Sequence, residues 1–347
     1  MTLGPLMVDV AGTVLTDEDR RVLAHPLVGA VILFTRNFAD IGQLEALVRE
    51  MRAIRRPPLL VTVDHEGGRV QRFRSDFTVL PPQRAIGHAW DLDPEAGRRL
   101  AWRCGWLLAA ELRAIGVDLS FAPCVDLDYG VSEVIGDRAY HRDPEAVATL
   151  AVASMLGMRA AGMAACAKHY PGHGAVVADS HKSLPVDRRP LAELDAELLP
   201  YRRLIANGLP AVMAAHVQFP EVDEAPAGFS RRWIQDELRG RLGFTGAVFS
   251  DDLSMGGAAY AGSVPERARR ALAAGCDILS VCNDRAAVLA TLEELAGEAD
   301  PLSQVRLARL HGRPGPGRTE LAADPHWLEC RAAVDRALEA PPLRLDA

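Results

Sequence analysis

Short apolar runs alternate with longer amphipathic stretches along the sequence, and this alternation most limits what the chain can fold into. Each run is too short for an ordinary helix, and several are rich in valine and isoleucine, so the runs predict buried strands. Consecutive strands separated by helices predict a parallel sheet. The runs are residues 5–10, 29–34, 58–64, 116–123, 163–169, 211–216, 246–252 and 277–283.

The stretches between the runs predict helices. In residues 40–54, Leu44, Leu47, Val48, Met51 and Ile54 recur on one helical face. Two stretches begin with Asp-Pro, a typical helix start, and end near a glycine. The predicted helices span residues 16–24, 40–54, 93–116, 143–162, 230–243, 263–275 and, at the end of the chain, 325–340.

Eight strands alternating with helices predict closure into a single-domain TIM-type (β/α)8 barrel. An open, doubly wound sheet is the alternative. A sheet of that kind typically has a glycine-rich motif after its first strand, and "DVAGTVLTDED" does not match that motif. We predict that residues 1–300 form the catalytic barrel. Residues 301–347 are predicted to be a helical tail that packs on the barrel and carries no chemistry of its own.

Charge and cysteine usage exclude several classes of protein. The net charge of −7 and the pI of about 5.8 argue against a nucleic-acid partner. No apolar run reaches the ~18 residues that span a bilayer, and no signal peptide is evident, so we expect no membrane association and a cytoplasmic location. None of the six cysteines forms a CxxC pair, which predicts buried free thiols.

Polar residues stand at the carboxyl end of nearly every predicted strand. The carboxyl ends of barrel strands carry the active site, so these side chains should converge on one concave surface. Such a surface suits a polar ligand with many hydroxyl groups, such as a sugar. The strand-end residues include Asp9, Asp64, Asp126, Lys168, His169, His216, Asp251 and Asn283.

The segment "VDHEGGRVQRF" suggests how a sugar could be held. The Asp64 carboxylate and the Arg72 guanidinium could grip ring hydroxyls, while Gly67 and Gly68 allow a tight turn. Alternatively, Arg72 pairs with Glu66 in a simple charged loop. Arg138 lies in a later loop from which it could also reach the site.

The histidines of "KHYPGHGAVVADSH" allow more than one interpretation. His169 and His173 are four residues apart, but Pro171 and Gly172 prevent the helical arrangement of a zinc site. A metal-dependent hydrolase is therefore a weaker alternative. Asp179 and His181, two residues apart, could form an acid/base dyad, or simply an exposed turn.

Asp251 follows the residues "GAVFS" of a predicted strand and is well placed to attack a sugar's anomeric carbon. Neighbouring residues of a strand point to opposite faces. If strand geometry persists through Asp252, only one of the two carboxylates should face the site.

Together these motifs resemble the short bacterial β-N-acetylglucosaminidases of glycoside hydrolase family 3, which act in peptidoglycan recycling. The resemblance spans roughly residues 5–285, in the order of the family's motifs. The motifs are "VTVDHEGGRVQRF", "FAPCVDLD", "IGDRAYHRDP", "KHYPGHGAVVADSH" and "VFSDDLSMGGA".

The resemblance implies a retaining exo-β-N-acetylglucosaminidase that acts on muropeptide sugars. Asp251 is then the nucleophile, and His181 is the acid/base with Asp179 as its partner. It also implies that no metal or organic cofactor is needed, and we expect a monomer. The implied sugar-binding residues are Asp64, Arg72, Arg138, Lys168 and His169. Two other activities remain open: a phosphorylase with the same residues, and a catalytically dead sugar-binding barrel.

Overall fold

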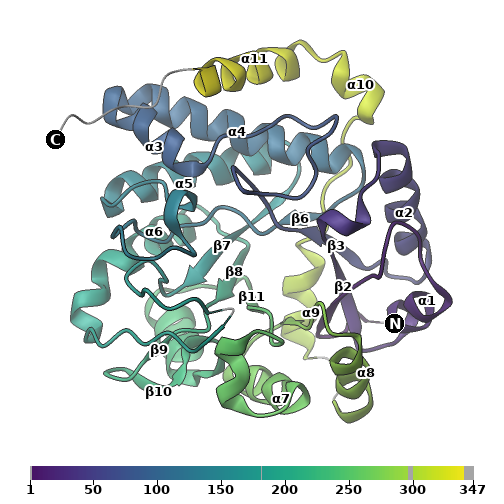
Figure 1. Ribbon diagram of the computed structural model, residues 1–347, viewed down its shortest axis with the longest axis vertical. Helices are drawn as coiled ribbons and strands as arrows, with labels where there is room; N and C mark the ends of the chain where they lie inside the picture. The colour runs from purple at the N-terminus through teal and green to yellow at the C-terminus, as the bar shows by residue number, and fades with distance from the viewer. Residues whose placement is uncertain (1, 181, 296–299, 340–347) are drawn as a thin grey trace.

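The computed structural model describes residues 2–180, 182–295 and 300–339. Its centre is a barrel of eight parallel strands, in the order β11-β8-β7-β6-β3-β2-β1-β12 (Figure 1). Hydrogen bonds between Asp277 N and Val248 O, 2.7 Å, and between Ser250 N and Ile278 O, 2.9 Å, join the last two strands and close the barrel. The predicted barrel is therefore confirmed. The strands are β1 (Leu6–Asp9), β2 (Val28–Leu33), β3 (Leu60–Val63), β6 (Leu119–Ser120), β7 (Ala164–Tyr170), β8 (Ala211–Ala214), β11 (Ala247–Ser250) and β12 (Leu279–Ser280).

Helices surround the barrel, and each predicted helix is present. They are α1 (Asp17–Ala24), α2 (Ile41–Ala53), α4 (Pro94–Ala114), α5 (Pro144–Ala160), the π-type helix η5 (Arg232–Arg241), α7 (Val264–Ala274) and α11 (Pro325–Glu339). Within the described residues, five further α-helices were not predicted: α3 (Gln83–Leu92), α6 (Asp195–Ala206), α8 (Arg285–Glu294), α9 (Pro301–Ala308) and α10 (Arg318–Ala322).

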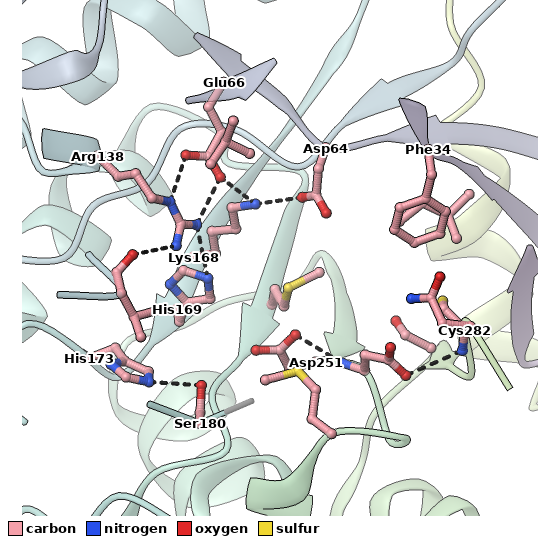
Figure 2. A pocket seen from close by; sticks show the side chains of 18 of the residues that line it. Phe34, Asp64, Glu66, Arg138, Lys168, His169, His173, Ser180, Asp251 and Cys282 are labelled. Carbon is pink, nitrogen blue, oxygen red and sulfur yellow. Dashed lines mark hydrogen bonds and ion pairs between the residues drawn. The ribbon is translucent and has the colours of Figure 1, made fainter. Parts of the chain in front are cut away.

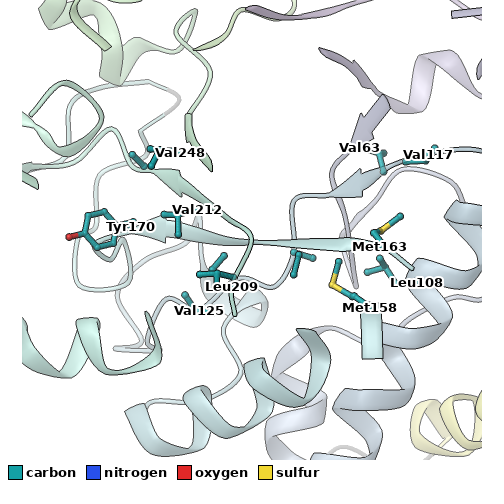
Figure 3. Packing of buried hydrophobic residues seen from close by; sticks show 14 of the residues in the cluster. Val63, Leu108, Val117, Val125, Met158, Met163, Tyr170, Leu209, Val212 and Val248 are labelled. Atoms are coloured by element: carbon teal, nitrogen blue, oxygen red, sulfur yellow. The ribbon is translucent and has the colours of Figure 1, made fainter. Parts of the chain in front are cut away.

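The core has two layers because successive strand residues face opposite sides of the barrel wall. Met213 and Phe249 point inward and pack in the barrel interior. Their neighbours Val212 and Val248 belong instead to the larger cluster between strands and helices, which also contains Leu108 and Met158 (Figure 3). This two-sided burial explains why the strands read as continuous apolar runs.

The chain beyond residue 300 contacts the barrel in two places. Leu307 and Leu310 are buried within the inner cluster. Helices α10 and α11 lie along α4 on the outside of the molecule (Figure 1), where Trp327 donates to Glu111 at 2.8 Å. The division of the chain at residue 300 stays a prediction.

The cysteines agree with a further expectation. All six cysteines are buried and free, as predicted. Within the described ranges, no helix combines the length and the apolar character needed to cross a bilayer.

Candidate active site

A cavity of about 350 Å³ opens at the carboxyl ends of the barrel strands (Figure 2). It is lined by six of the residues predicted from the sequence: Asp64, Arg72, Arg138, Lys168, His169 and Asp251. These residues come from loops and strand ends far apart in the chain, and the barrel brings them together.

The turn between β4 (His65–Gly67) and β5 (Val70–Gln71) forms one wall of the cavity. Gly67 and Gly68 have φ angles of 116° and 53°, which side-chain-bearing residues rarely adopt. A Cβ on Gly67 would lie 2.5 Å from the carbonyl oxygen of Pro81. The predicted tight turn is therefore present, and it requires glycine.

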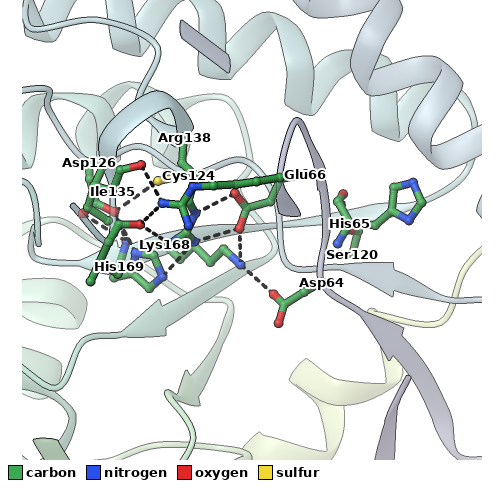
Figure 4. A network of polar contacts seen from close by, with 12 residues as sticks. Asp64, His65, Glu66, Ser120, Cys124, Asp126, Ile135, Arg138, Lys168 and His169 are labelled. Atoms are coloured by element: carbon green, nitrogen blue, oxygen red, sulfur yellow. Dashed lines mark hydrogen bonds and ion pairs between the residues drawn. The ribbon is translucent and has the colours of Figure 1, made fainter. Parts of the chain in front are cut away.

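The Glu66 carboxylate lies between two cationic side chains of the cavity, Arg138 and Lys168 (Figure 4). Its two carboxylate oxygens accept hydrogen bonds from Arg138 at 3.0 and 2.8 Å, and one oxygen lies 2.7 Å from Lys168 Nζ. Burial alone would raise the pKa of Glu66, but Arg138 and Lys168 hold this pKa well below its usual range. Glu66 is thus a buried anion that fixes two cationic side chains.

Asp64 occupies the open side of the same group. Lys168 Nζ donates to Asp64 Oδ1 at 2.7 Å, and Arg72 lies 3.6 Å from Asp64 Oδ2. Among the described residues Arg72 pairs with Asp64, so the alternative pairing of Arg72 with Glu66 is wrong. Asp64 is only partly buried, which leaves its carboxylate accessible to a ligand in the cavity.

Asp126 binds two histidines that line the cavity, His169 and His173. Its Oδ2 lies 2.7 Å from His169 Nδ1, and its Oδ1 accepts the backbone N–H of His173 at 2.7 Å. Burial would raise the pKa of Asp126, but the nearby histidines lower this pKa to about 2. His169 Nε2 then lies 3.4 Å from Arg138, so the position of one cavity residue is linked to that of another.

Cys124, Asp126 and His169 also form a group that could hold a metal ion, with one candidate ligand atom each within 4.8 Å. In the structure these atoms bond to one another: Cys124 Sγ donates to Asp126 at 3.2 Å, and His169 contacts the same oxygen. The Arg138 guanidinium beside His169 adds a positive charge that disfavours a cation there. A reaction without a metal stays the prediction.

Asp251 and Asp252 both line the cavity. The condition for only one of them to face it is not met, because β11 ends at Ser250 and strand alternation stops there. Asp252 Oδ1 accepts the backbone N–H groups of Ser254 at 3.0 Å and Cys282 at 3.2 Å. Burial raises the pKa of Asp252 to about 6.

His216, which follows β8, forms a hydrogen bond with the backbone of Asp252. Its ring is fully buried and stacks on Phe229 at 5.4 Å. Its Nε2 donates to the carbonyl oxygen of Asp252 at 3.0 Å. Burial lowers the pKa of His216, so a neutral ring holds the backbone that follows Asp251.

The proposed dyad is only partly described. His181 lies outside the described residues. Asp179 is half-buried, its carboxylate lies 3.7 Å from Lys182 Nζ, and it is not among the described residues that line the cavity. The intervening Ser180 does line the cavity.

Three residues of this site have more contacts there than the sequence predicts. The sequence offers Glu66 mainly as a partner of Arg72 and Asp126 only as a polar strand end. It assigns Ser180 no role. The signal for Asp126 was present in its place after the fourth strand, but the partners of Glu66 and Ser180 depend on contacts made only in the folded chain.

Comparison with known proteins identifies the family. A model of the glycosyl hydrolase family 3 N-terminal domain matches residues 6–310. The chain belongs to glycosyl hydrolase family 3.

Relatives within the family narrow the activity. The chain is 54% identical to a β-hexosaminidase of Thioalkalivibrio sulfidiphilus over 346 residues, 100% of both chains. It is 58% identical to a β-hexosaminidase of Thiobacillus denitrificans, over 95% of this chain and 92% of that protein. At this identity over nearly the full length, this family 3 member is a glycosidase of the β-hexosaminidase type, as the resemblance implied.

Solved structures of a similar protein have the same fold as this chain. NagZ from Neisseria gonorrhoeae, in complex with N-trifluoroacetyl-D-glucosamine, superposes with a TM-score of 0.93 and 44% identity, over 98% of this chain and 99% of that one. The same protein in complex with a zinc ion superposes with a TM-score of 0.91 and 42% identity, over 97% and 98% of the two chains.

Proposed function

We propose that this enzyme is a retaining exo-β-N-acetylglucosaminidase that removes terminal N-acetylglucosamine from peptidoglycan fragments. The observation that carries the proposal is the division of one cavity into two parts. Asp64, Lys168 and Arg138 offer charged hydrogen-bonding groups for sugar hydroxyls, and Asp251 offers a carboxylate in the same cavity. The N-trifluoroacetyl-D-glucosamine bound to the gonococcal NagZ supports the choice of sugar.

The proposed reaction has two displacements. Asp251 attacks the anomeric carbon, and the bond to the leaving oxygen breaks as His181 donates a proton to that oxygen. In the second step His181 removes a proton from water, and the water oxygen displaces Asp251 from the anomeric carbon. Asp179 holds the tautomer of His181 and stabilises its protonated form. Two inversions leave the β configuration unchanged.

The Asp251→Ala variant tests the nucleophile. Hydrolysis of an aryl N-acetyl-β-D-glucosaminide should fall by at least about 10³-fold, because no covalent intermediate can form. Mass spectrometry of a quenched reaction should find one N-acetylglucosaminyl group on the wild-type protein and none on the variant. Replacement of the exposed Asp17 by alanine is the matched control. An active, folded Asp251→Ala variant would overturn the proposal.

A phosphorylase would use the same residues with phosphate as the acceptor. Turnover should be the same with and without inorganic phosphate, and the product should be free N-acetylglucosamine. A sugar phosphate as the main product would replace the hydrolase proposal. A disaccharide-peptide from peptidoglycan, compared with the aryl glycoside, tests the proposed natural substrate class. The monomeric state and the cytoplasmic location remain predictions.

A further inference from the structure

Ser180 lies between the two proposed acid/base residues and is held from both sides. Its hydroxyl lies 3.0 Å from His173 Nε2 (Figure 2), and its carbonyl oxygen accepts the backbone N–H of Gly257 at 2.8 Å. Ser180 is 2% exposed and lines the cavity. We call these two hydrogen bonds the Ser180 anchor.

The anchor is attached to the sugar-binding wall through Asp126. The Asp126 carboxylate accepts the backbone N–H of His173 and also contacts the ring of His169. His169 lines the cavity and lies 3.4 Å from Arg138. One buried carboxylate therefore fixes both a proposed sugar-binding histidine and the histidine that holds Ser180.

The surroundings of His173 fit a positioning role. His173 is 1% exposed, and burial lowers its pKa, so its ring is neutral at neutral pH. A neutral ring forms a hydrogen bond with a hydroxyl without placing another charge beside Asp126. Because Pro171 and Gly172 turn the chain before it, the ring faces back toward Ser180 rather than continuing the line of β7.

Gly257 completes the anchor because no larger residue fits at its position. A Cβ on Gly257 would lie 2.8 Å from the Ser180 carbonyl oxygen and 3.3 Å from His216 Cβ. The same glycine therefore donates to Ser180 and lies where a side chain would press on His216, the histidine that supports Asp252. The anchor thus links the segment of the proposed acid/base to the segment of the proposed nucleophile, Asp251.

We propose that His173 is a positioning residue, which through Ser180 holds the proposed acid/base segment at the cavity. This inference rests on the proposed function. His173 does not touch the sugar's reacting atoms in this proposal; it sets where the proton donor stands relative to the leaving oxygen. Loss of the anchor should therefore weaken proton transfer while sugar binding by Asp64 and Lys168 continues.

Leaving-group dependence tests the proposal. A phenyl N-acetyl-β-D-glucosaminide needs a proton on its leaving oxygen, whereas the 2,4-dinitrophenyl glycoside does not. The Ser180→Ala and His173→Ala variants should lose about 10-fold or more in kcat/KM for the phenyl substrate. For the dinitrophenyl substrate kcat/KM should change less than about threefold. Azide, which needs no general base, should raise the variants' kcat for the dinitrophenyl substrate.

Three comparisons separate positioning from a structural effect. His173→Gln, which can keep a hydrogen bond to Ser180, should recover part of the phenyl-substrate activity. The double alanine variant should be no slower than the slower single variant, because both act through one hydrogen bond. The control His326→Ala, in the C-terminal tail, should leave both substrates within about twofold. Thermal unfolding identifies any variant that fails to fold, and Ser180→Ala, the smaller change, then carries the test.

Three results would each overturn the proposal. The variants could lose kcat/KM equally on both substrates, or keep the wild-type kcat/KM with the phenyl substrate. The fold losses in kcat/KM of the two single variants could also multiply in the double variant. These failures are distinguishable from failure of the proposed function. If Asp251→Ala is inactive while the Ser180 and His173 variants behave as wild type, only the anchor proposal fails. If Asp251→Ala retains activity, the proposed function fails whatever the anchor variants do.

Discussion

Glu66 is a buried carboxylate with two cationic partners, Arg138 and Lys168, and its replacement should cost stability as well as binding. Glu66→Gln leaves two buried cations without their anion, which should lower the free energy of unfolding by roughly 3 kcal/mol. KM for an aryl N-acetylglucosaminide should rise because both cations lose their fixed positions. Urea unfolding and steady-state kinetics measure the two effects.

Glu329 offers a matched control for Glu66, because it also pairs with an arginine, Arg103, at 2.8 Å, but its side chain is 64% exposed. Glu329→Gln should change stability by less than about 1 kcal/mol. The pKa of Glu66 is lowered in the folded protein, so its stabilising effect is present above the unfolded value of about 4.3 and shrinks below it. Equal, small effects of the two substitutions would contradict this account.

The location of single site residues could be predicted, but their pairing could not. Asp64, Lys168 and His169 were found because each ends a strand, and strand ends of a barrel share one face. Glu66 and Arg138 are 72 positions apart, and Asp126 and His169 are 43 apart. No local pattern states which loops meet, so these pairs became visible only in the folded chain.

At the scale of elements, every strand of the barrel was predicted, but the short strands outside it, such as β4 and β5, and several helices were not. Buried barrel strands leave a strong signal of valine- and isoleucine-rich runs. Helix α6 contains Pro200, a residue that normally ends a helix, and α3 begins after Pro82 with no side-chain cap. Packing against the barrel forms these helices despite weak local signals.

The short helix η6 (Gly256–Ala261) should control the acid/base segment through Gly257. Gly257→Ala places a methyl group 2.8 Å from the Ser180 carbonyl oxygen, where the backbone must move. We expect about a 10-fold or larger loss of kcat/KM with the phenyl glycoside, and a smaller loss with the dinitrophenyl glycoside. Gly12→Ala is the control, since nothing lies within 4 Å of its added Cβ. Wild-type kinetics of Gly257→Ala would show that this segment tolerates displacement.

At the scale of the whole molecule, Glu111 connects the C-terminal tail to the loop behind β5. Its carboxylate accepts the Trp327 indole N–H at 2.8 Å, and also the backbone N–H of Thr78 at 2.8 Å and its hydroxyl at 2.6 Å. Trp327 is buried and contacts Glu111 of α4. The tail therefore contributes to stability at a distance from the cavity.

Substitution of Trp327 tests this contribution. Trp327→Phe keeps most of the ring but removes the N–H donor, and should lower the free energy of unfolding by about 1–2 kcal/mol. Trp327→Ala should lower it by about 3–5 kcal/mol, because it also leaves a cavity. Leu328→Ala, 52% exposed on the same helix, should cost much less. Urea unfolding gives these values. Each folded variant should keep the wild-type kcat, because none of these side chains is among the described residues that line the cavity. A Trp327→Phe protein that is fully folded yet inactive would contradict this and would place the tail in the catalytic mechanism.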